Sequence, residues 1–430
     1  MHDGQVIPSA IVLSHREQLG RLAQGCPEAL PVAYVAGDPC LDQLTTGTAF
    51  RQTYRRALGL LPGQRLVVVS STWGRGSVLG SPSTTALRRA LAELPADEFR
   101  ILAAIHPNAW YAHGAWQIRT WLAPLLDHGL ILPSPESETW KSALCAADFL
   151  IGDSGSLSLY GIELGIPTLL GAFQDSVVAP DSPMRKLGDL VPRLDAARPL
   201  PDQLTRAAEA QRDDPELAAL RGSVTSEPGR SAALLRRLLY SRLDLAEPSH
   251  PAATRAIPVP SIPAEDGRRL PQLPAMAVTT EVEEREATVS VRRHPGPLQG
   301  SQQRHLAGAH LTADPDDPDP RWPRSADVLV LPRERCPRAE AVKWSDFAAR
   351  YPACGLVAVE EADRGCTVLF ADDTRLRARW TDRPTWASFT VAASAVHAWA
   401  ERFPVREHVR IEVRAGDRLA PALLEVAPVR

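Results

Sequence analysis

A short turn rich in glycine and serine carries the clearest chemical signal in this sequence. Residues 152–156 (Gly-Asp-Ser-Gly-Ser) follow an apolar strand-like run and precede a helical pattern. The N-terminus of a helix offers unpaired amides and about half a positive charge, so it binds anions such as phosphate. Ser154 and Ser156 can add hydroxyl donors, and Gly155 allows close approach of the backbone. Simple helix capping by Asp153, Ser154 or Ser156 is the structural alternative.

A histidine follows a second apolar run, residues 99–105, and is followed by Pro107 and Asn108. The carboxyl ends of parallel strands line the ligand crevice of an α/β sheet, so His106 is expected at the same edge as the serine turn. There a histidine can donate a proton to a phosphate or leaving-group oxygen near neutral pH. A loop histidine in a proline turn is the alternative, and His113 is a weaker candidate.

A third polar segment, residues 70–74 (Ser-Ser-Thr-Trp-Gly), follows an apolar run and contains Thr72 and Trp73. Further glycines at 76 and 80 would let the backbone approach a ligand. The spacing is neither the dinucleotide fingerprint nor a P-loop. A mobile loop without a ligand is the alternative.

These segments must be positioned by alternating strands and helices. Nearly continuous apolar runs predict buried strands, and the intervening segments have helical periodicity. This alternation predicts an α/β fold with a Rossmann-like parallel sheet, closed by a helix over residues 231–245. The predicted strands are 64–71, 99–105, 130–132, 149–151 and 168–170, and the predicted helices are 83–94, 116–126, 139–147 and 157–164.

The rest of the chain has a different character. Prolines recur through residues 246–302, which predicts a semi-extended linker. Within it, residues 277–293 alternate like a strand, either as an isolated hairpin or as the start of the next domain. Residues 303–430 predict a smaller α+β domain of unknown role, with antiparallel pairing and an amphipathic helix over 386–403.

Composition excludes several classes of function. The 48 basic and 51 acidic residues nearly cancel, which argues against a nucleic-acid partner. No apolar run approaches the ~20 residues of a membrane helix, and the N-terminus does not resemble a signal peptide. The six cysteines form no C-x-x-C pair, so we expect free thiols in a reducing cytoplasm. The acidic run at 314–320 lacks the pattern of a calcium loop, and we predict neither a metal site nor a cofactor.

The order of these motifs resembles a known family. The segments 37–42, 71–73, 106–108 and 152–156 occur as in the C-terminal half of the CDP-glycerol glycerophosphotransferases, which are GT-B enzymes. Residues 153–167 also resemble the UDP-N-acetylglucosamine 2-epimerases, another GT-B group. The resemblance covers about residues 10–245, and we recognise no family for residues 303–430.

The resemblance implies a nucleotide-diphosphate donor bound by this half of the chain. It implies that Ser154, Gly155 and Ser156 hold the pyrophosphate and that His106 contacts phosphate as the catalytic residue. Thr72 would lie near them. The predicted substrate-binding set also includes four neighbouring or related positions, Trp73, Asn108, Asp153 and Glu163.

Two departures from the family keep alternatives open. Tyr160 stands where the transferases carry an acidic residue, and Glu163, three residues later, is the candidate substitute.

Residues 1–35 resemble only the end of a GT-B first domain, before a donor-binding domain at 36–245. The reading frame is therefore truncated, or a partner chain supplies that half, or the chain no longer catalyses transfer. The sequence predicts a glycosyl- or glycerophosphoryl-transferase-like protein, with a non-catalytic nucleotide-sugar-binding or scaffold module as the alternative.

Overall fold

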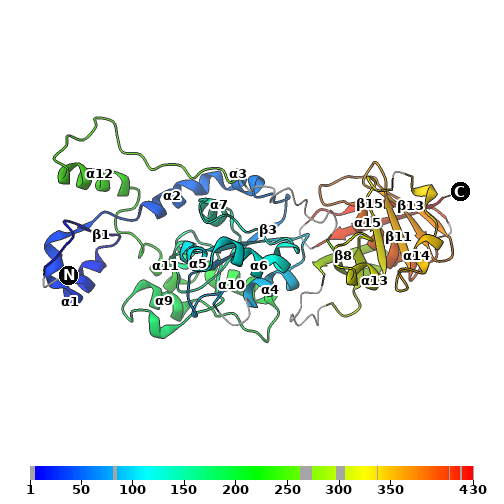
Figure 1. Ribbon diagram of the computed structural model, residues 1–430, viewed down its shortest axis with the longest axis horizontal. Helices are drawn as coiled ribbons and strands as arrows, with labels where there is room; N and C mark the ends of the chain where they lie inside the picture. Colours follow the sequence, from blue (N-terminus) through cyan, green and yellow to red (C-terminus); the bar gives the residue numbers. More distant parts are fainter. Residues whose placement is uncertain are drawn as a thin grey trace.

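The computed structural model describes residues 5–80, 85–261, 274–296, 306–336, 338–405, 407–416 and 419–429. Figure 1 shows a small N-terminal unit, an α/β domain and a β-rich domain along the longest axis. The N-terminal unit consists of β1 (Ile11–Leu13), α1 (Glu17–Gly25) and β2 (Ala33–Val35). Its strands pair in parallel as a separate two-stranded sheet, and none of the residues of β1, α1 or β2 is buried.

The α/β domain contains a four-stranded parallel sheet in the order β4-β3-β5-β6. Its strands are β3 (Arg65–Ser71), β4 (Phe99–Ile105), β5 (Phe149–Gly152) and β6 (Thr168–Leu170). This confirms the predicted Rossmann-like parallel sheet. The predicted strand at 130–132 is reduced to one isolated bridge, between Ile131 and Leu102.

Helices cover both faces of this sheet. Along β3, Val67 and Val69 belong to one buried cluster and Leu66 and Val68 to another, so the strand is apolar on both sides. The helices of this domain are α2 (Pro39–Gly47), α3 (Arg51–Ala57), α4 (Thr85–Glu93), α5 (Pro107–His113), α6 (Ala115–Leu126), α7 (Thr139–Ala146), α8 (Ser156–Glu163), α9 (Pro183–Leu190), α10 (Leu200–Arg212), α11 (Pro215–Leu220) and, away from the sheet, α12 (Ser231–Arg242).

The C-terminal domain is a closed barrel of mixed strands in the order β10-β11-β12-β13-β15-β14-β8-β7-β9. Short helices α13 (Arg321–Ser325) and α14 (Ser345–Ala348) lie in its connections. The strands are β7 (Met276–Glu283), β8 (Thr288–Pro295), β9 (His310–Ala313), β10 (Val328–Leu331), β11 (Leu356–Glu360), β12 (Cys366–Phe370), β13 (Arg375–Trp380), β14 (Val409–Ala415) and β15 (Ala422–Pro428).

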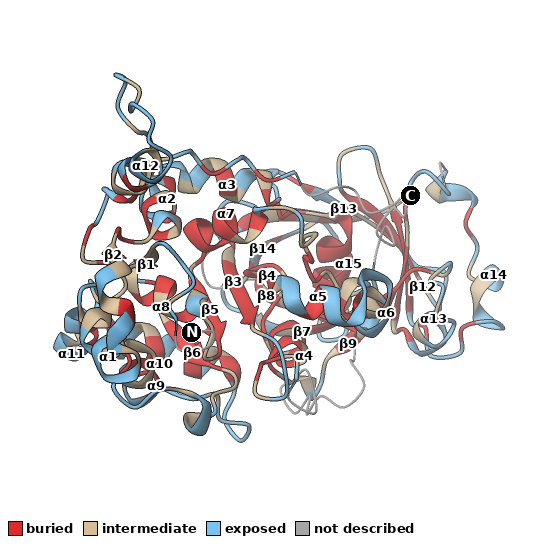
Figure 2. Cartoon of the chain, turned by 60° about the vertical axis from the view of Figure 1, so that its left-hand side comes forward, coloured by how far each residue is buried: buried red, intermediate tan, exposed pale blue. Residues whose placement is uncertain are grey.

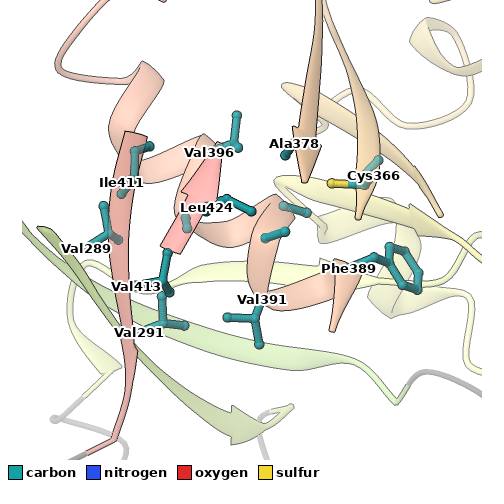
Figure 3. Close-up of a cluster of buried hydrophobic side chains, with 14 of the residues drawn as sticks. Val289, Val291, Cys366, Ala378, Phe389, Val391, Val396, Ile411, Val413 and Leu424 are labelled. Atoms are coloured by element: carbon teal, nitrogen blue, oxygen red, sulfur yellow. The ribbon is translucent and has the colours of Figure 1, made fainter. Parts of the chain in front are cut away.

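One helix forms the centre of the barrel core. In α15 (Phe389–Ala400), ten of twelve residues are buried, where the sequence predicts an amphipathic helix. Small and branched side chains such as Ala392 and Val396 let several strands pack closely around it. Figure 3 shows Val391 and Val396 of this helix among side chains from β8, β14 and β15.

The structure also differs from the predicted linker at 246–302. Strands β7 and β8 fall inside that segment, pair with each other and join β9 and β14, so the barrel begins before residue 303. The many prolines of residues 246–302 led to the prediction of a linker, and they hide the hairpin of β7 and β8 because they flank it. Upstream, the segment lies against the α/β domain: Tyr54 donates to the Ile257 carbonyl at 3.1 Å, and the Ile257 side chain is buried.

The two domains are joined by a buried ion pair. The guanidinium of Arg293, on β8, lies 2.5 Å from Asp97, two residues before β4, and it also donates to Thr390 at 2.7 Å. The amide of Ala96 donates to the Arg293 carbonyl at 2.8 Å. These contacts place the barrel at the edge of the sheet where β4 begins.

Candidate functional site

Three strand ends that the sequence predicts to converge do meet. The amide of His106, after β4, donates to the carbonyl of Ser71 at 2.9 Å, and the amide of Thr72, after β3, donates to Asp153 at 2.8 Å. Asp153 follows β5. A Cβ placed on Gly155 would lie 3.4 Å from the Cβ of Thr72, so the two residues are close neighbours. The carboxyl-end edge of the sheet thus brings Thr72, His106 and the serine turn together.

The buried side chain of Asp153 connects the segments that form this edge of the sheet. Its side chain is fully buried, and its oxygens accept amides from Thr72 at 2.8 Å, Val78 at 3.2 Å and Gly155 at 3.0 Å. Burial raises the pKa of Asp153, and these three amides oppose that shift because they stabilise the carboxylate. Asp153 therefore holds the loop after β3 against the turn before α8, as a positioning residue.

His106 has a defined orientation. Its Nδ1 accepts the amide of Asn108 at 3.0 Å and caps α5, where the sequence offers a proline turn as the alternative. Because Nδ1 is an acceptor, the neutral ring carries its proton on Nε2. Partial burial lowers the pKa of His106, and the negative charge of Asp153 acts in the opposite direction. At neutral pH the ring is therefore a neutral hydrogen-bond donor through Nε2.

Trp73 covers the imidazole of His106. Their ring centroids lie 4.4 Å apart at an angle of 46°, and the indole is more than half exposed. Asn108 is exposed on the first turn of α5. Trp73 thus contacts a candidate catalytic residue and faces solvent, while Asn108 takes part through its backbone amide.

The start of α8 provides the anion-binding element. Gly155 is its N-cap residue in an extended conformation, with φ −82° and ψ 159°, and no side chain caps the helix there. The amide of Gly155 is used by Asp153, so the first-turn amides without an intrahelical acceptor are those of Ser156 and the following residue. Ser154 is half-buried and Ser156 is exposed. The first-turn amides of α8 and the residue His106 therefore lie at the same edge of the sheet.

Glu163 lies apart from this group. It is the last residue of α8, about 10 Å along the helix axis from Ser156. Its carboxylate accepts the amides of Gly222 at 2.7 Å and Val224 at 3.3 Å. The structure thus gives Glu163 a role in holding a neighbouring loop.

Asp38 is a neighbour of α8 that the sequence analysis assigns no role. Its carboxylate caps α2 through the amides of Cys40 and Leu41, and it accepts the phenol of Tyr160 at 2.9 Å. Burial is the largest cause of the raised pKa of Tyr160 and of the rise in the pKa of Cys40 to about 11. A carboxylate therefore faces Tyr160, the position where the transferases carry an acidic residue. The sequence motif at residues 37–42 contains Asp38 and is the signal that could have identified this carboxylate.

The acidic run at 314–320 has a structural role at two of its positions. Asp314 and Asp316 both pair with the guanidinium of Arg335, which holds the segment against the barrel. Among the described residues, no group of three or more histidine, cysteine or acidic side chains is arranged to hold a metal ion. None of the helices in the described part of the chain has both the length and the apolar character to cross a membrane.

Comparison with known proteins gives the following similarities. No protein-family model and no curated protein matches the chain. Among solved structures, it is similar to the wall teichoic acid polymerase TagF, with 16% identity over 55% of this chain and 58% of that chain and a TM-score of 0.39. It is also similar to a UDP-GlcNAc 2-epimerase from Neisseria meningitidis bound to UDP-GlcNAc, with 13% identity over 54% of this chain and 61% of that one and a TM-score of 0.33.

A third similar structure is S. aureus MnaA in complex with UDP, with 12% identity over 56% of this chain and 62% of that one and a TM-score of 0.32. The alignments therefore span less than two thirds of each of these proteins. They include both kinds of protein that the sequence motifs resemble. Each of these alignments covers about half of this chain.

Proposed function

We propose that this chain binds a nucleotide-diphosphate donor where β3, β4 and β5 end, and that it is a glycosyl- or glycerophosphoryl-transferase-like protein. The observation that supports this most is the convergence of Thr72, His106 and the N-terminus of α8 on one edge of the sheet. Strand ends of parallel sheets are where α/β folds bind ligands, and a helix N-terminus suits a diphosphate.

In this proposal the protein stabilises a leaving group and forms no covalent bond to the substrate. An acceptor hydroxyl forms the new bond and releases its proton to solvent, while the nucleotide leaves with the electron pair of the broken bond. The new negative charge would develop close to Nε2–H of His106 and the first amides of α8. Donors that are already oriented lower the barrier because they need not rearrange as charge develops.

In this proposal, the residues that bind the acceptor alcohol would come from a second protein surface. We propose that a partner chain supplies it, and the N-terminal unit supports this. A two-stranded parallel sheet without a buried residue in either strand is unusual, since parallel sheets are normally covered on both faces.

The six cysteines are free in the structure, which supports a reducing, cytoplasmic setting.

Calorimetric titration with CDP-glycerol and UDP-GlcNAc tests the proposal. We expect at least one of them to bind, and His106→Ala to weaken it by about tenfold, the effect of losing one good hydrogen bond to a charged group. His113→Ala is the matched control, because His113 is an exposed histidine on the same helix. If neither compound binds to the unmodified chain, the proposal fails.

A specific observation also favours a non-catalytic binding module. Tyr160 replaces an acidic residue of the transferases, and the carboxylate of Glu163 is occupied by the amides of Gly222 and Val224. A donor bound without any turnover, in the presence of acceptor alcohols, would favour the module. Release of the nucleotide that depends on His106 would favour the transferase.

A further inference from the structure

Trp73 and His106 form a pair of contacting rings at the carboxyl-end edge of the sheet. Their ring centroids lie 4.4 Å apart, and the two residues follow different strands, β3 and β4. In Figure 2 the strands of the sheet are buried, in red, whereas much of α5, which His106 caps, is exposed, in pale blue. The indole itself is 54% exposed. Trp73 therefore contacts His106 at the open edge of the domain and not in its core.

The backbone on both sides of Trp73 is held in place. The amide of Thr72 donates to the buried carboxylate of Asp153 at 2.8 Å, and the amide of Val78 donates to the same carboxylate at 3.2 Å. The loop that carries the indole is thus fixed at both of its ends by one side chain. This support gives the indole a defined position over His106.

The imidazole of His106 is also constrained. Its Nδ1 accepts the amide of Asn108 at 3.0 Å, and its backbone amide donates to the carbonyl of Ser71 at 2.9 Å. The hydrogen bond fixes one ring atom, and the indole limits how far the ring plane can tilt. Among the described residues, none forms a hydrogen bond with Nε2. The N–H at Nε2 is therefore free to donate to a ligand.

We propose that Trp73 is a positioning residue for His106, because its indole keeps the imidazole in the orientation that the Asn108 hydrogen bond defines. The inference rests on the proposed function, in which His106 stabilises the leaving group. A hydrogen-bond donor that is already oriented stabilises developing charge without having to rearrange. The sequence analysis places Trp73 in the substrate-binding set, whereas here it acts through His106.

An indole beside an imidazole can act on the charge of that ring in two opposite ways. It keeps water from one ring face, which disfavours the imidazolium, and its π electrons attract a cation, which favours the imidazolium. Burial is the largest cause of the lowered pKa of His106. We therefore expect the exclusion of water to be the stronger effect of Trp73, and this effect keeps His106 neutral near pH 7.

Nuclear magnetic resonance titration of the full chain tests the inference without any ligand. His106→Ala identifies the signals of His106 among those of the 11 histidines. In Trp73→Ala we expect the pKa of His106 to rise toward the ordinary value of 6.5, because water reaches the uncovered ring face. Trp73→Phe keeps an aromatic ring over the imidazole and should keep the pKa of the unmodified chain. An unchanged or lower pKa in Trp73→Ala would overturn the inference.

Trp121→Ala is the matched control. Trp121 is 53% exposed and also contacts a histidine, His113, at 5.0 Å between ring centroids. Its removal should leave the titration of His106 unchanged. An equal shift of the His106 pKa in Trp73→Ala and Trp121→Ala would contradict a specific role of Trp73.

Release of CMP from CDP-glycerol, with an acceptor alcohol present, measures the effect on the reaction. For Trp73→Ala we expect kcat to fall about tenfold and KM to change by less than about twofold, since the donor still binds but His106 is less well oriented. Trp73→Phe should restore most of kcat. A loss confined to KM would make Trp73 a substrate contact and overturn the positioning role. If neither CDP-glycerol nor UDP-GlcNAc binds, the proposed function fails, while the titration still decides whether Trp73 acts on His106.

Discussion

The carboxylate of Asp153 accepts the backbone amide of Thr72 at 2.8 Å and thereby joins the ends of β5 and β3. Two further amides, from Val78 and Gly155, complete the environment of this fully buried side chain. A single carboxylate thus shapes both the loop after β3 and the turn before α8.

Asp153→Asn should lower the free energy of unfolding by about 1.5–3 kcal/mol, because the new side-chain amide would point a donor at backbone donors. It should also weaken binding of the donor nucleotide, since the turn before α8 loses its support. Urea denaturation and calorimetry measure the two effects. Asp175→Asn, at a half-exposed aspartate paired with Arg193 at the surface, is the control and should change stability much less.

Glu163→Gln should leave the dissociation constant of the donor nucleotide unchanged. Its carboxylate holds the loop at residues 222–224, at the opposite end of α8 from Ser156. The variant should lose about 1 kcal/mol of stability, because one charged acceptor for two amides becomes neutral. A tenfold loss of nucleotide affinity, at about 1.4 kcal/mol, would instead return Glu163 to the site.

Asp97→Ala should be strongly destabilising. It leaves the guanidinium of Arg293, 18% exposed, without the carboxylate that lies 2.5 Å away, and breaking such a buried pair costs about 3–5 kcal/mol. Chemical denaturation followed by domain-specific proteolysis would measure it. Arg292→Ala is the control, since this neighbouring arginine pairs with the exposed Glu281 and should contribute less than about 1 kcal/mol. Equal effects of the two variants would contradict the importance of the interdomain pair.

The barrel should lose stability in acid because of a buried histidine pair. The rings of His310 and His397 lie 4.6 Å apart, and His310 also bonds Ser394 at 2.9 Å. Burial lowers the pKa of both, that of His310 to about 3, while Glu401 and Asp327 act to raise that of His397. Since the unfolded chain binds the proton more readily, stability is complete above the unfolded pKa near 6.5 and falls as pH decreases below it.

From His310 alone, the expected loss is about 2 kcal/mol between pH 7 and pH 5. Unfolding curves over this pH range would measure it. His310→Gln should flatten the pH dependence even if it lowers stability overall. His408→Gln, at an exposed histidine, should leave the slope unchanged. An equal slope in the unmodified chain and in His310→Gln would contradict this origin.

The sequence predicts the α/β domain well because local signals suffice there. The apolar run at Phe99–Ile105 matches β4 at both ends, and the other three strands of the sheet differ by no more than one residue at each end. The convergence of Thr72, His106 and Gly155 follows from strand direction alone. By contrast, α5 is missed because Pro107, a favourable first residue of a helix, also fits a turn.

The barrel could be predicted only in part. The hairpin of β11 and β12 is joined at Asp363-Arg364-Gly365, a clear turn signal in the sequence, and its strands pair antiparallel as predicted for this domain. Closure of the barrel depends on pairs far apart in sequence, such as β8 with β14, and on a helix whose polar residues, Ser394 and Thr390, are buried with partners. The hydrophobic periodicity of a helical segment predicts which of its faces is exposed to solvent. It does not reveal that strands surround the helix.

The ion pair of Asp97 with Arg293 has a geometric consequence. The barrel is fixed to the amino ends of β3 and β4, and the serine turn lies past their carboxyl ends, roughly 20 Å away for a seven-residue strand. A molecule bound to the barrel and another bound at His106 would therefore lie beyond opposite ends of these strands. The barrel therefore leaves the carboxyl-end edge with His106 uncovered at the point where this ion pair fixes it.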